Sequence, residues 1–191
     1  NLLELSGIET TSPKPAPTNH VADFATGSPT PIEVPLTWTD VTGAIKSDAY
    51  LILANTTGVF IDPVNLITID DDIDLGDGSG AVNIAPGVQN YTFAGLEFDT
   101  QYYFKIYSYT NSGSSVNWKT DVATSLSAAT KPNAVMVPAF TPSSSTAATI
   151  SWTKPTGYVD GTNSILVFVK AVSAVTAGIP TSAPSLYSSA V

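Results

Sequence analysis

The densest group of reactive side chains is a run of aspartates in the middle of the chain. The segment "IDDDIDLGDGSG" places carboxylates at closely spaced positions among glycines, and its acidic members are Asp70, Asp71, Asp72, Asp74 and Asp77. Calcium takes about six to eight oxygen ligands, which alternating aspartates in a glycine-containing loop can supply. The pattern therefore makes Asp70, Asp72, Asp74 and Asp77 candidate calcium ligands.

The spacing of this segment also departs from a calcium loop. Asp70, Asp72 and Asp74 match the first ligands of a helix–loop–helix site, but Gly76 stands one position late and Ala81 occupies the position of the closing glutamate. A solvated acidic turn, in which Asp and Gly satisfy the turn geometry, explains the same residues. Both interpretations stay open, and calcium is the only cofactor that the sequence suggests.

A second group of side chains consists of the tyrosines in "DTQYYFKIYSYTNSG". Apolar and other residues alternate here, which predicts a β-strand with two different faces. Tyr103, Tyr107 and Tyr109 fall on the outward face, and we expect Trp118 to join them. Aromatic rings pack on sugars and tyrosine is favoured at interfaces, so the stripe predicts a surface for glycan or protein. The alternative is aromatic pairing across strands that only stabilises the sheet.

Other catalytic chemistry finds no support in the sequence. His20 is the single histidine, no serine stands in a G-x-S-x-G motif, and the glutamates are dispersed. The chain has no cysteine, which excludes disulfides, cysteine-ligated zinc and a thiol nucleophile. We therefore predict no catalytic residues and no enzyme in this segment, and a catalytic domain elsewhere in a larger parent protein stays open.

Composition limits the classes of partner. Seven basic residues stand against 16 acidic residues, for a net charge of -9. That balance argues against nucleic acid, because binding to it depends on neutralising phosphates with Lys and Arg. Apolar residues make up 43% of the chain, enough for a buried core. No apolar run approaches the roughly 20 residues of a membrane-spanning helix.

Short strands must position these side chains. The segments "PIEVPLTWTD" and "AYLILANT" alternate in the same way as the tyrosine run, and "HVADFAT", "NYTFAGL" and "DVATSLSAAT" are further candidates. Gly, Pro and Asn punctuate these segments, and no stretch has a sustained helical period. This pattern predicts an all-β fold of immunoglobulin-like sandwiches. The long acidic insert between "AYLILANT" and "NYTFAGL" is expected to add a hairpin.

A repeat indicates two tandem domains. The segment "LTWTDVTG" at 36–43 is echoed by "ISWTKPTG" at 150–157. The second copy has room for about half a sandwich, so we expect it to be incomplete in this chain. The predicted organisation is the end of a preceding domain at 1–10, a Pro-rich linker at 11–18, a sandwich with the acidic insert at 19–131 and the start of a second sandwich at 132–191.

The first domain resembles a fibronectin type III domain. The resemblance rests on "PLTWTD" and on "LEFDTQYYFKIYS", in which Leu96, Thr100 and Tyr102 follow the spacing of that family. It implies that Tyr102 turns a corner of the sandwich and that its hydroxyl bonds to nearby backbone. The second domain resembles the family only through "ATISWTKPTG". The core residues that the resemblance implies are Trp38, Leu96, Tyr102, Phe104 and, in the second domain, Trp152.

The sequence also resembles repeats in secreted modular proteins of Bacteroidota, for example in "DLGDGSGAVNIAPGVQNYTFAGL". Many such proteins are exported by the type IX secretion route and carry lamin-tail or nuclease modules. The resemblance implies an extracellular or cell-surface parent protein. It implies adjoining domains of the same polypeptide as partners, together with glycans or surface proteins.

These observations lead to one expected function and two alternatives. We expect a non-catalytic structural spacer or interaction module of a secreted or surface-attached multidomain protein. The first alternative is an adhesin or carbohydrate-binding module that uses the exposed tyrosine stripe. The second is a subunit of an extracellular filament, in which the half-domain and the N-terminal strand pair between chains.

Overall fold

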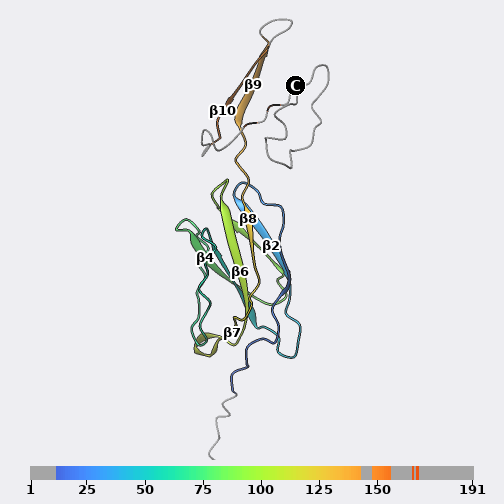
Figure 1. The fold of residues 1–191 in the computed structure, drawn as a ribbon, viewed down its shortest axis with the longest axis vertical. Coiled ribbons are helices and arrows are strands. Elements are labelled where there is room, and N and C mark those ends of the chain that lie inside the picture. Colours follow the sequence, from blue (N-terminus) through green and yellow to red (C-terminus); the bar gives the residue numbers. More distant parts are fainter. Residues whose placement is uncertain (1–11, 143–147, 156–164, 166, 168–191) are drawn as a thin grey trace, which may run out of the picture. The chain divides into compact units, whose positions relative to one another are not determined.

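A computed structural model describes residues 12–142, 148–155, 165 and 167 (Figure 1). The chain divides into two compact units, Asn1–Pro132 and Asn133–Val191. In the described residues every element is a β-strand except one short 3₁₀ turn, η1 (Gly113–Ser115). None of these residues lies in a helix of the length and hydropathy needed to cross a membrane. The prediction of an all-β fold is confirmed.

The smaller sheet of the first unit has three antiparallel strands in the order β1-β2-β5. Their bounds are β1 (Ala22–Thr26), β2 (Glu33–Thr39) and β5 (Asn90–Ala94). Alternation along β2 turns Val34, Leu36 and Trp38 toward the core while the residues between them face outward. The central strand of this sheet therefore supplies much of the buried surface.

The larger sheet is built around β6 (Gln101–Thr110), its longest strand. On one side β6 pairs with β3 (Ala49–Asn55), which pairs in turn with β4 (Ser79–Ile84). On its other side β6 pairs first with β8 (Ser125–Ala129) and nearer its end with β7 (Asn117–Lys119). β7 and β8 thus follow one another along the same flank of β6, as Figure 1 shows.

The core of the first unit lies between these two sheets. Trp38, Leu96, Tyr102 and Phe104 are all buried in it. The Trp38 ring meets Tyr50 edge-on at 6.1 Å. The main-chain N–H of Glu97 donates a 3.0 Å hydrogen bond to the Tyr102 hydroxyl oxygen, which is the corner contact that the resemblance implies. The prediction of an antiparallel β-sandwich is confirmed for the first unit.

The insert, residues 56–78, joins β3 to β4 without forming the expected hairpin. Its one β-bridge pairs Asp72 with Ala81, just inside β4. Elsewhere it crosses the outer face of the larger sheet as an extended loop and contacts β7. There, Leu66 N–H donates to the Val116 carbonyl at 2.8 Å and the Asn65 side chain accepts from Trp118 N–H at 2.7 Å. The insert is therefore a cover for one sheet face.

In the second unit the structure describes one antiparallel hairpin, formed by β9 (Met136–Pro142) and β10 (Ala148–Thr153). Trp152 lies on β10 and is 39% exposed, whereas Trp38 is 3% exposed. The core position predicted for Trp152 is therefore not seen. The rest of the predicted second sandwich lies outside the described residues.

Candidate functional site

The outer face of the larger sheet carries a second buried cluster, which we call the outer cluster. It consists of Leu51, Ala81, Tyr107, Val116 and Trp118, with Tyr109 and Ile69 partly buried against it. Tyr107 is 0% exposed and Trp118 is 4% exposed. The insert and the segment around η1 cover these side chains. The prediction that Tyr107 and Trp118 form an exposed binding surface is therefore wrong.

Tyr107 is tied to the insert by a polar contact as well as by burial. Its hydroxyl donates to Asp62 Oδ1 at 2.7 Å, and Lys105 Nζ donates to the same oxygen at 2.7 Å. The Lys105 ammonium also lies 5.1 Å from the centre of the Tyr107 ring. The Lys105 contact and the Tyr107 hydrogen bond lower the pKa of Asp62, while burial and then Asp62 raise the pKa of Tyr107 far above its usual value. The three side chains fasten the insert to β6.

Tyr109 and Trp118 form the aromatic pair of the outer cluster. The two residues face one another across β6 and β7, and their ring centres are 4.5 Å apart. The Tyr109 hydroxyl donates to Asn83 Oδ1 at 3.0 Å, and Trp118 Nε1–H donates to the Ile67 carbonyl at 3.1 Å. Burial raises the pKa of Tyr109, and the negative charge of Asp71 adds to the shift. Cross-strand pairing that stabilises the sheet, the alternative interpretation of the stripe, fits these contacts.

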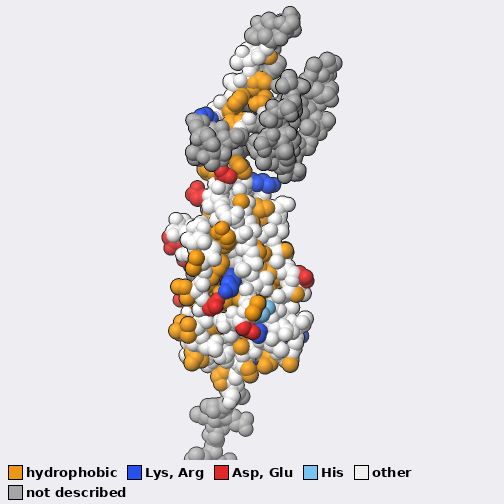
Figure 2. Space-filling view, in the orientation of Figure 1, with side chains coloured by type: hydrophobic (Ala, Val, Ile, Leu, Met, Phe, Trp, Pro, Cys, Tyr) orange, Lys and Arg blue, Asp and Glu red, His pale blue; other side chains and the backbone are white. Residues whose placement is uncertain are grey.

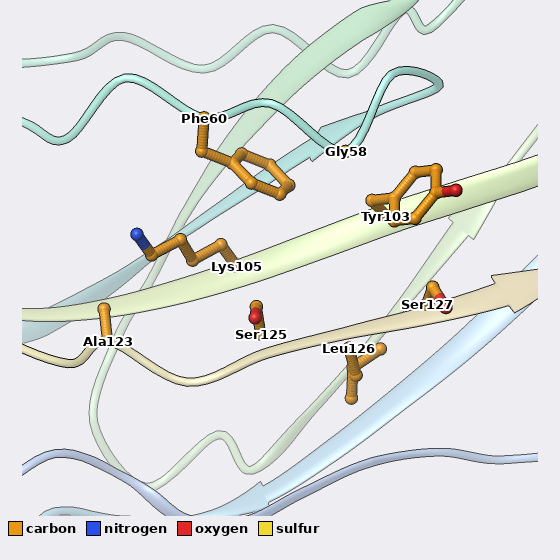
Figure 3. Close-up of a pocket in the computed structure, with 8 residues that line it drawn as sticks. All are labelled: Gly58, Phe60, Tyr103, Lys105, Ala123, Ser125, Leu126 and Ser127. Atoms are coloured by element: carbon orange, nitrogen blue, oxygen red, sulfur yellow. The ribbon is translucent and has the colours of Figure 1, made fainter.

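Tyr103, a member of the predicted stripe, borders an open groove on the outer face of the larger sheet. A groove of about 520 Å³ lies between the insert and β8, over the first half of β6 (Figure 3). Its lining includes Gly58 and Phe60 from the insert, Tyr103 and Lys105 from β6, and Ser125 and Ser127 from β8. The sequence did not predict Phe60 or the two serines as site residues. The alternation in "ATSLSAAT" was the one pattern that could have placed Ser125 and Ser127 on the same face of a strand.

The aspartates of the insert bond to nearby backbone. Asp72 Oδ1 accepts from Asp74 N–H at 3.2 Å, Asp74 Oδ1 from Gly76 N–H at 2.8 Å, and Asp77 Oδ1 from Ser79 N–H at 3.0 Å. In each of these turns the carboxylate accepts a hydrogen bond from the main-chain N–H two residues later. Across the described residues no three His, Asp or Glu side chains converge as metal ligands. The bonds of Asp72, Asp74 and Asp77 fit the acidic turn, which is the alternative interpretation of this segment.

Asp71 and Gly80 fix the return of the insert to β4. Asp71 Oδ1 accepts hydrogen bonds from both the main-chain N–H (2.7 Å) and the side-chain amide (2.9 Å) of Asn83. At Gly80 a β-carbon would stand 2.9 Å from the Asp72 carbonyl oxygen and 2.7 Å from Leu75. Only glycine allows so close an approach of the two chains. The return of the insert to the sheet is therefore fixed by contacts between the insert and β4.

The polypeptide preceding β1 is attached to the end of β6, by contacts that we call the N-terminal attachment. Lys14 N–H donates to Asn111 Oδ1 at 2.9 Å, and Asn117 Nδ2 donates to the Lys14 carbonyl at 2.7 Å. Thr110 Oγ1 donates to the Pro15 carbonyl at 2.8 Å, and Lys14 Nζ pairs with Asp48 at 2.7 Å. The Lys14 contact lowers the pKa of Asp48. Described residues of the predicted linker thus lie against the sandwich.

The polypeptide following β8 is attached near the start of β6, by contacts that we call the C-terminal attachment. Thr130 is 2% exposed, and its hydroxyl donates to the Glu97 carbonyl at 2.7 Å and accepts from Thr100 N–H at 2.9 Å. Lys131 N–H donates to the Thr30 carbonyl at 3.0 Å. Figure 1 shows the chain reaching the first unit at the end where β7 lies and leaving it at the other end.

Comparison with known proteins finds similarity at the level of the fold. No protein-family model matches the chain, and no curated protein matches it. Among solved structures, a two-domain fibronectin type III segment of chicken tenascin is 18% identical, covers 72% of this chain and 63% of its own, and has a TM-score of 0.47. The fn3 domain of human contactin 1 is 16% identical, covers 70% of this chain and 96% of its own, and has a TM-score of 0.45.

A third similar structure is the fn3 domain of human collagen alpha-1(XX) chain, which is 15% identical, covers 67% of this chain and 95% of its own, and has a TM-score of 0.41. All of these likenesses are weak. The sandwich is therefore recognised from the order and pairing of its own strands.

Proposed function

We propose that this chain is a non-catalytic structural spacer and interaction module within a larger multidomain protein. The observation that carries the proposal is that the incoming and outgoing polypeptide are hydrogen-bonded at opposite ends of β6. This strand has 10 residues. At about 3.3 Å per residue it separates the two attachments by about 30 Å. A module that fixes both chain ends in this way holds whatever adjoins it at a set distance.

The chemistry of the attachments supports a fixed spacing. Most of their bonds are made to main-chain atoms of Lys14, Pro15, Glu97 and Lys131, so rotation of those side chains does not release the chain. The partly buried hydrogen bonds of the Thr110 and Thr130 hydroxyls each contribute about 1 kcal/mol, and the exposed bonds to Lys14 contribute less. Several together oppose free swing of the polypeptide where it meets the sandwich.

The use of ionisable side chains supports a module without catalysis. Asp48 and Asp62 each accept from a lysine ammonium, and Asp71 binds Asn83. Turns are closed by Asp72, Asp74 and Asp77. Active sites instead hold titratable groups together in a cleft with strongly shifted pKa values. The proposal therefore assigns the carboxylates to structure and leaves any catalysis to other domains of the parent protein.

We place the parent protein outside the cell or on its surface, with adjoining domains as the immediate partners. This part rests on the similarity of the sequence to secreted modular repeats of Bacteroidota. Detection with an antibody against the first unit, in intact-cell and culture-medium fractions of the source bacterium, tests it. We expect the antigen on the surface or in the medium, and its confinement to the cytoplasmic fraction would contradict the placement.

Distance measurements between two spin labels, by double electron–electron resonance, test whether the first unit acts as a rigid spacer. The chain has no cysteine, so spin labels can be attached through Ser12→Cys and Lys131→Cys alone. We expect one narrow distance distribution across the first unit. The paired changes Asn111→Gly and Asn117→Ala remove the hydrogen bonds that the two asparagine side chains make to Lys14. Glycine keeps the backbone conformation at φ 62 of Asn111.

The paired change and a control variant make opposite predictions for the width of the distance distribution. The paired change should broaden the distribution, whereas Ser112→Ala, an exposed neighbour, should leave it narrow. A broad distribution in the unaltered chain would contradict the spacer. The alternative of a strand-exchanged filament relies on residues 1–10 and on the second unit, most of which lie outside the described residues. Size-exclusion chromatography separates it from the spacer, since a filament elutes at a mass that rises with concentration.

A further inference from the structure

We propose that the groove between the insert and β8 binds a neutral saccharide chain. The inference rests on the proposed role as an interaction module and gives that role a site and a class of ligand. It moves the binding surface away from the tyrosine stripe, since of those residues Tyr103 is the one that lines the groove. Four features of the groove support a saccharide ligand: its shape, its aromatic rings, its hydroxyl groups and its charge.

The shape of the groove suits an extended ligand. Its volume of about 520 Å³ lies within the range of ligand sites, which is about 300 to 1,000 Å³. One wall is the insert, and the floor is the outer face of β6 and β8 (Figure 3). The small side chains of Ser125 and Ser127 leave space above this floor. A chain molecule can therefore lie along the floor while its ends extend beyond it.

Two aromatic rings border the groove. Figure 3 shows Phe60 and Tyr103 on the same side of β6, and both are partly exposed. A β-carbon at Gly58 would stand 3.2 Å from the Tyr103 ring, so the backbone of the insert packs on this ring and restricts its orientation. Restricting a ring before binding lowers the entropy lost on binding. The apolar C–H faces of a sugar pack on such rings.

Three hydroxyl groups accompany the rings: those of Tyr103, Ser125 and Ser127. Figure 3 shows Ser125 and Ser127 on one side of β8 and Leu126 on the other, as alternation requires. Within the described part of the chain, none of the three hydroxyls has a hydrogen-bond partner in the protein. Each can both donate and accept, which matches the hydroxyl groups of a sugar.

The groove carries no unbalanced charge. Lys105 is its one ionised lining residue, and the ammonium lies 2.7 Å from Asp62 Oδ1 with 19% of the side chain exposed. The Lys105 contact lowers the pKa of Asp62, which keeps this carboxylate ionised at neutral pH. Figure 2 shows few charged side chains on the visible face of this unit. A neutral ligand therefore fits better than an acidic one, which would require an unpaired cation.

An extended peptide is the competing ligand, because β8 is an edge strand. A peptide that added to this edge would lie beside Leu126, where β1 of the other sheet is close to β8. It would lie away from Phe60 and Tyr103, which stand above the face of the sheet (Figure 3). The rings and the serine hydroxyls thus favour a ligand that lies on the face over one that pairs with the edge.

Titration of the full chain with neutral oligosaccharides tests the site. The probes are the hexaoses of cellulose, amylose, xylan, mannan and chitin. Binding is measured by calorimetry and by changes in amide chemical shifts. We expect at least one to bind and to shift the amides of Phe60, Tyr103 and Ser127. Phe60→Ala and Tyr103→Ala should each weaken binding about tenfold, since one aromatic contact contributes up to about 1.4 kcal/mol. Ile61→Ala, an 86% exposed neighbour outside the groove, is the matched control.

Two further variants keep the test decisive. Tyr103→Phe retains the ring and should lose only the part of the affinity that depends on the hydroxyl. Ser127→Val blocks the floor without touching the core, so it tests the site even if Tyr103→Ala unfolds. Melting temperatures of all variants separate loss of binding from loss of fold.

Several results would overturn the proposal. These are no binding of any hexaose at millimolar concentration, binding unchanged by the groove variants, and recovery from a random-peptide library of a peptide whose binding the same variants abolish. The distance measurement on the spin-labelled chain is independent of all three. A narrow distribution without saccharide binding would leave the spacer standing and remove the groove ligand, whereas a broad distribution with binding would do the reverse.

Discussion

The larger sheet of the first unit has two aromatic faces that are buried in different ways. The inner face, with Tyr102 and Phe104, packs against a second sheet. The outer face, with Tyr107 and Trp118, packs against a loop of irregular structure. Both faces belong to the same strands and follow the same alternation. An outward-pointing residue is therefore not necessarily an exposed residue when a long insert lies next to the sheet.

The two faces also differ in the contacts that hold their covers. On the inner face the rings of Phe93 and Phe104 are 5.3 Å apart, and burial of apolar surface dominates. On the outer face the loop is held by Asp62, Asn65 and Asp71. They bond to Tyr107, the main-chain N–H of Trp118 and Asn83 respectively. We expect the outer cover to be less stable and more sensitive to pH than the inner one.

The largest expected effect comes from removing a ring on the inner face. Phe104 is 0% exposed, and Phe104→Ala should lower the free energy of unfolding by about 3 to 5 kcal/mol, because the other sheet cannot move in to fill the cavity. Urea denaturation followed by tryptophan fluorescence measures the change. Thr92→Ala on the exposed side of β5 is the control and should stay within about 0.5 kcal/mol. A loss below 1 kcal/mol for Phe104→Ala would place this ring outside the core.

Removing the large ring of the outer face should cost less. Trp118→Ala should lower the free energy of unfolding by about 2 to 3 kcal/mol, because a loop can collapse into part of the space that a sheet would leave empty. The same variant should make residues 56–78 sensitive to limited proteolysis under native conditions, whereas Phe104→Ala should not do so selectively. Equal protease sensitivity of the insert in Trp118→Ala and the unaltered chain would contradict the covering role.

Much of the inner face could be predicted from the sequence, because its determinants are local. The alternation along β6 and the spacing of Leu96, Thr100 and Tyr102 are visible within one short segment. The alternation predicted a buried strand, and the family resemblance that this spacing carries implied a Tyr102 hydroxyl that bonds to nearby backbone. The Glu97–Tyr102 hydrogen bond has this form.

The cover of the outer face could not be predicted, because its determinants are distant in sequence and have no period. Asn65 bonds to Trp118 through one side-chain oxygen, and Leu66 bonds to Val116 through backbone atoms alone. Alternation states which side of a strand a residue faces, but it does not state what lies on that side. The aspartates gave a similar ambiguity, because a turn and a calcium loop require the same residue types at similar spacing.

A pair of hydroxyl deletions sharpens the comparison without changing either ring. Tyr102→Phe leaves Glu97 N–H without its acceptor and should cost about 1 to 2 kcal/mol. Tyr107→Phe removes a donor from Asp62, whose carboxylate is 52% exposed and can bind water instead, so it should cost about 1 kcal/mol or less. Urea denaturation of the two variants side by side checks the order. A larger loss in Tyr107→Phe would mean that the outer cover is the more tightly held.

The smallest expected effect is the response of the outer cover to acid. The lowered pKa of Asp62 means that the folded state favours its ionised form, so this stabilisation is complete above the unfolded pKa of about 3.9 and is lost as pH falls through the lower folded value. Because Asp62 is half exposed, the loss should not exceed about 1 kcal/mol. Amide exchange in residues 56–78 should accelerate below about pH 4, after correction for intrinsic rates.

Asp62→Asn provides the control for the acid response. This variant should exchange faster at neutral pH and should lack the additional acceleration between about pH 4 and pH 2. An identical pH response in Asp62→Asn and the unaltered chain would assign the effect to other carboxylates.

Residue-resolved amide hydrogen exchange at neutral pH tests most directly whether the insert seals the outer face. Leu66 N–H bonds to the Val116 carbonyl at 2.8 Å, and Asp72 N–H bonds to the Ala81 carbonyl at 2.8 Å. We expect both amides to exchange at least about a hundredfold more slowly than an unstructured peptide, since local opening must precede exchange. Exchange of both amides at the rate of an unstructured peptide, while β6 stays protected, would contradict the covering role of the insert. Tyr107 and Trp118 would then lie on an exposed surface.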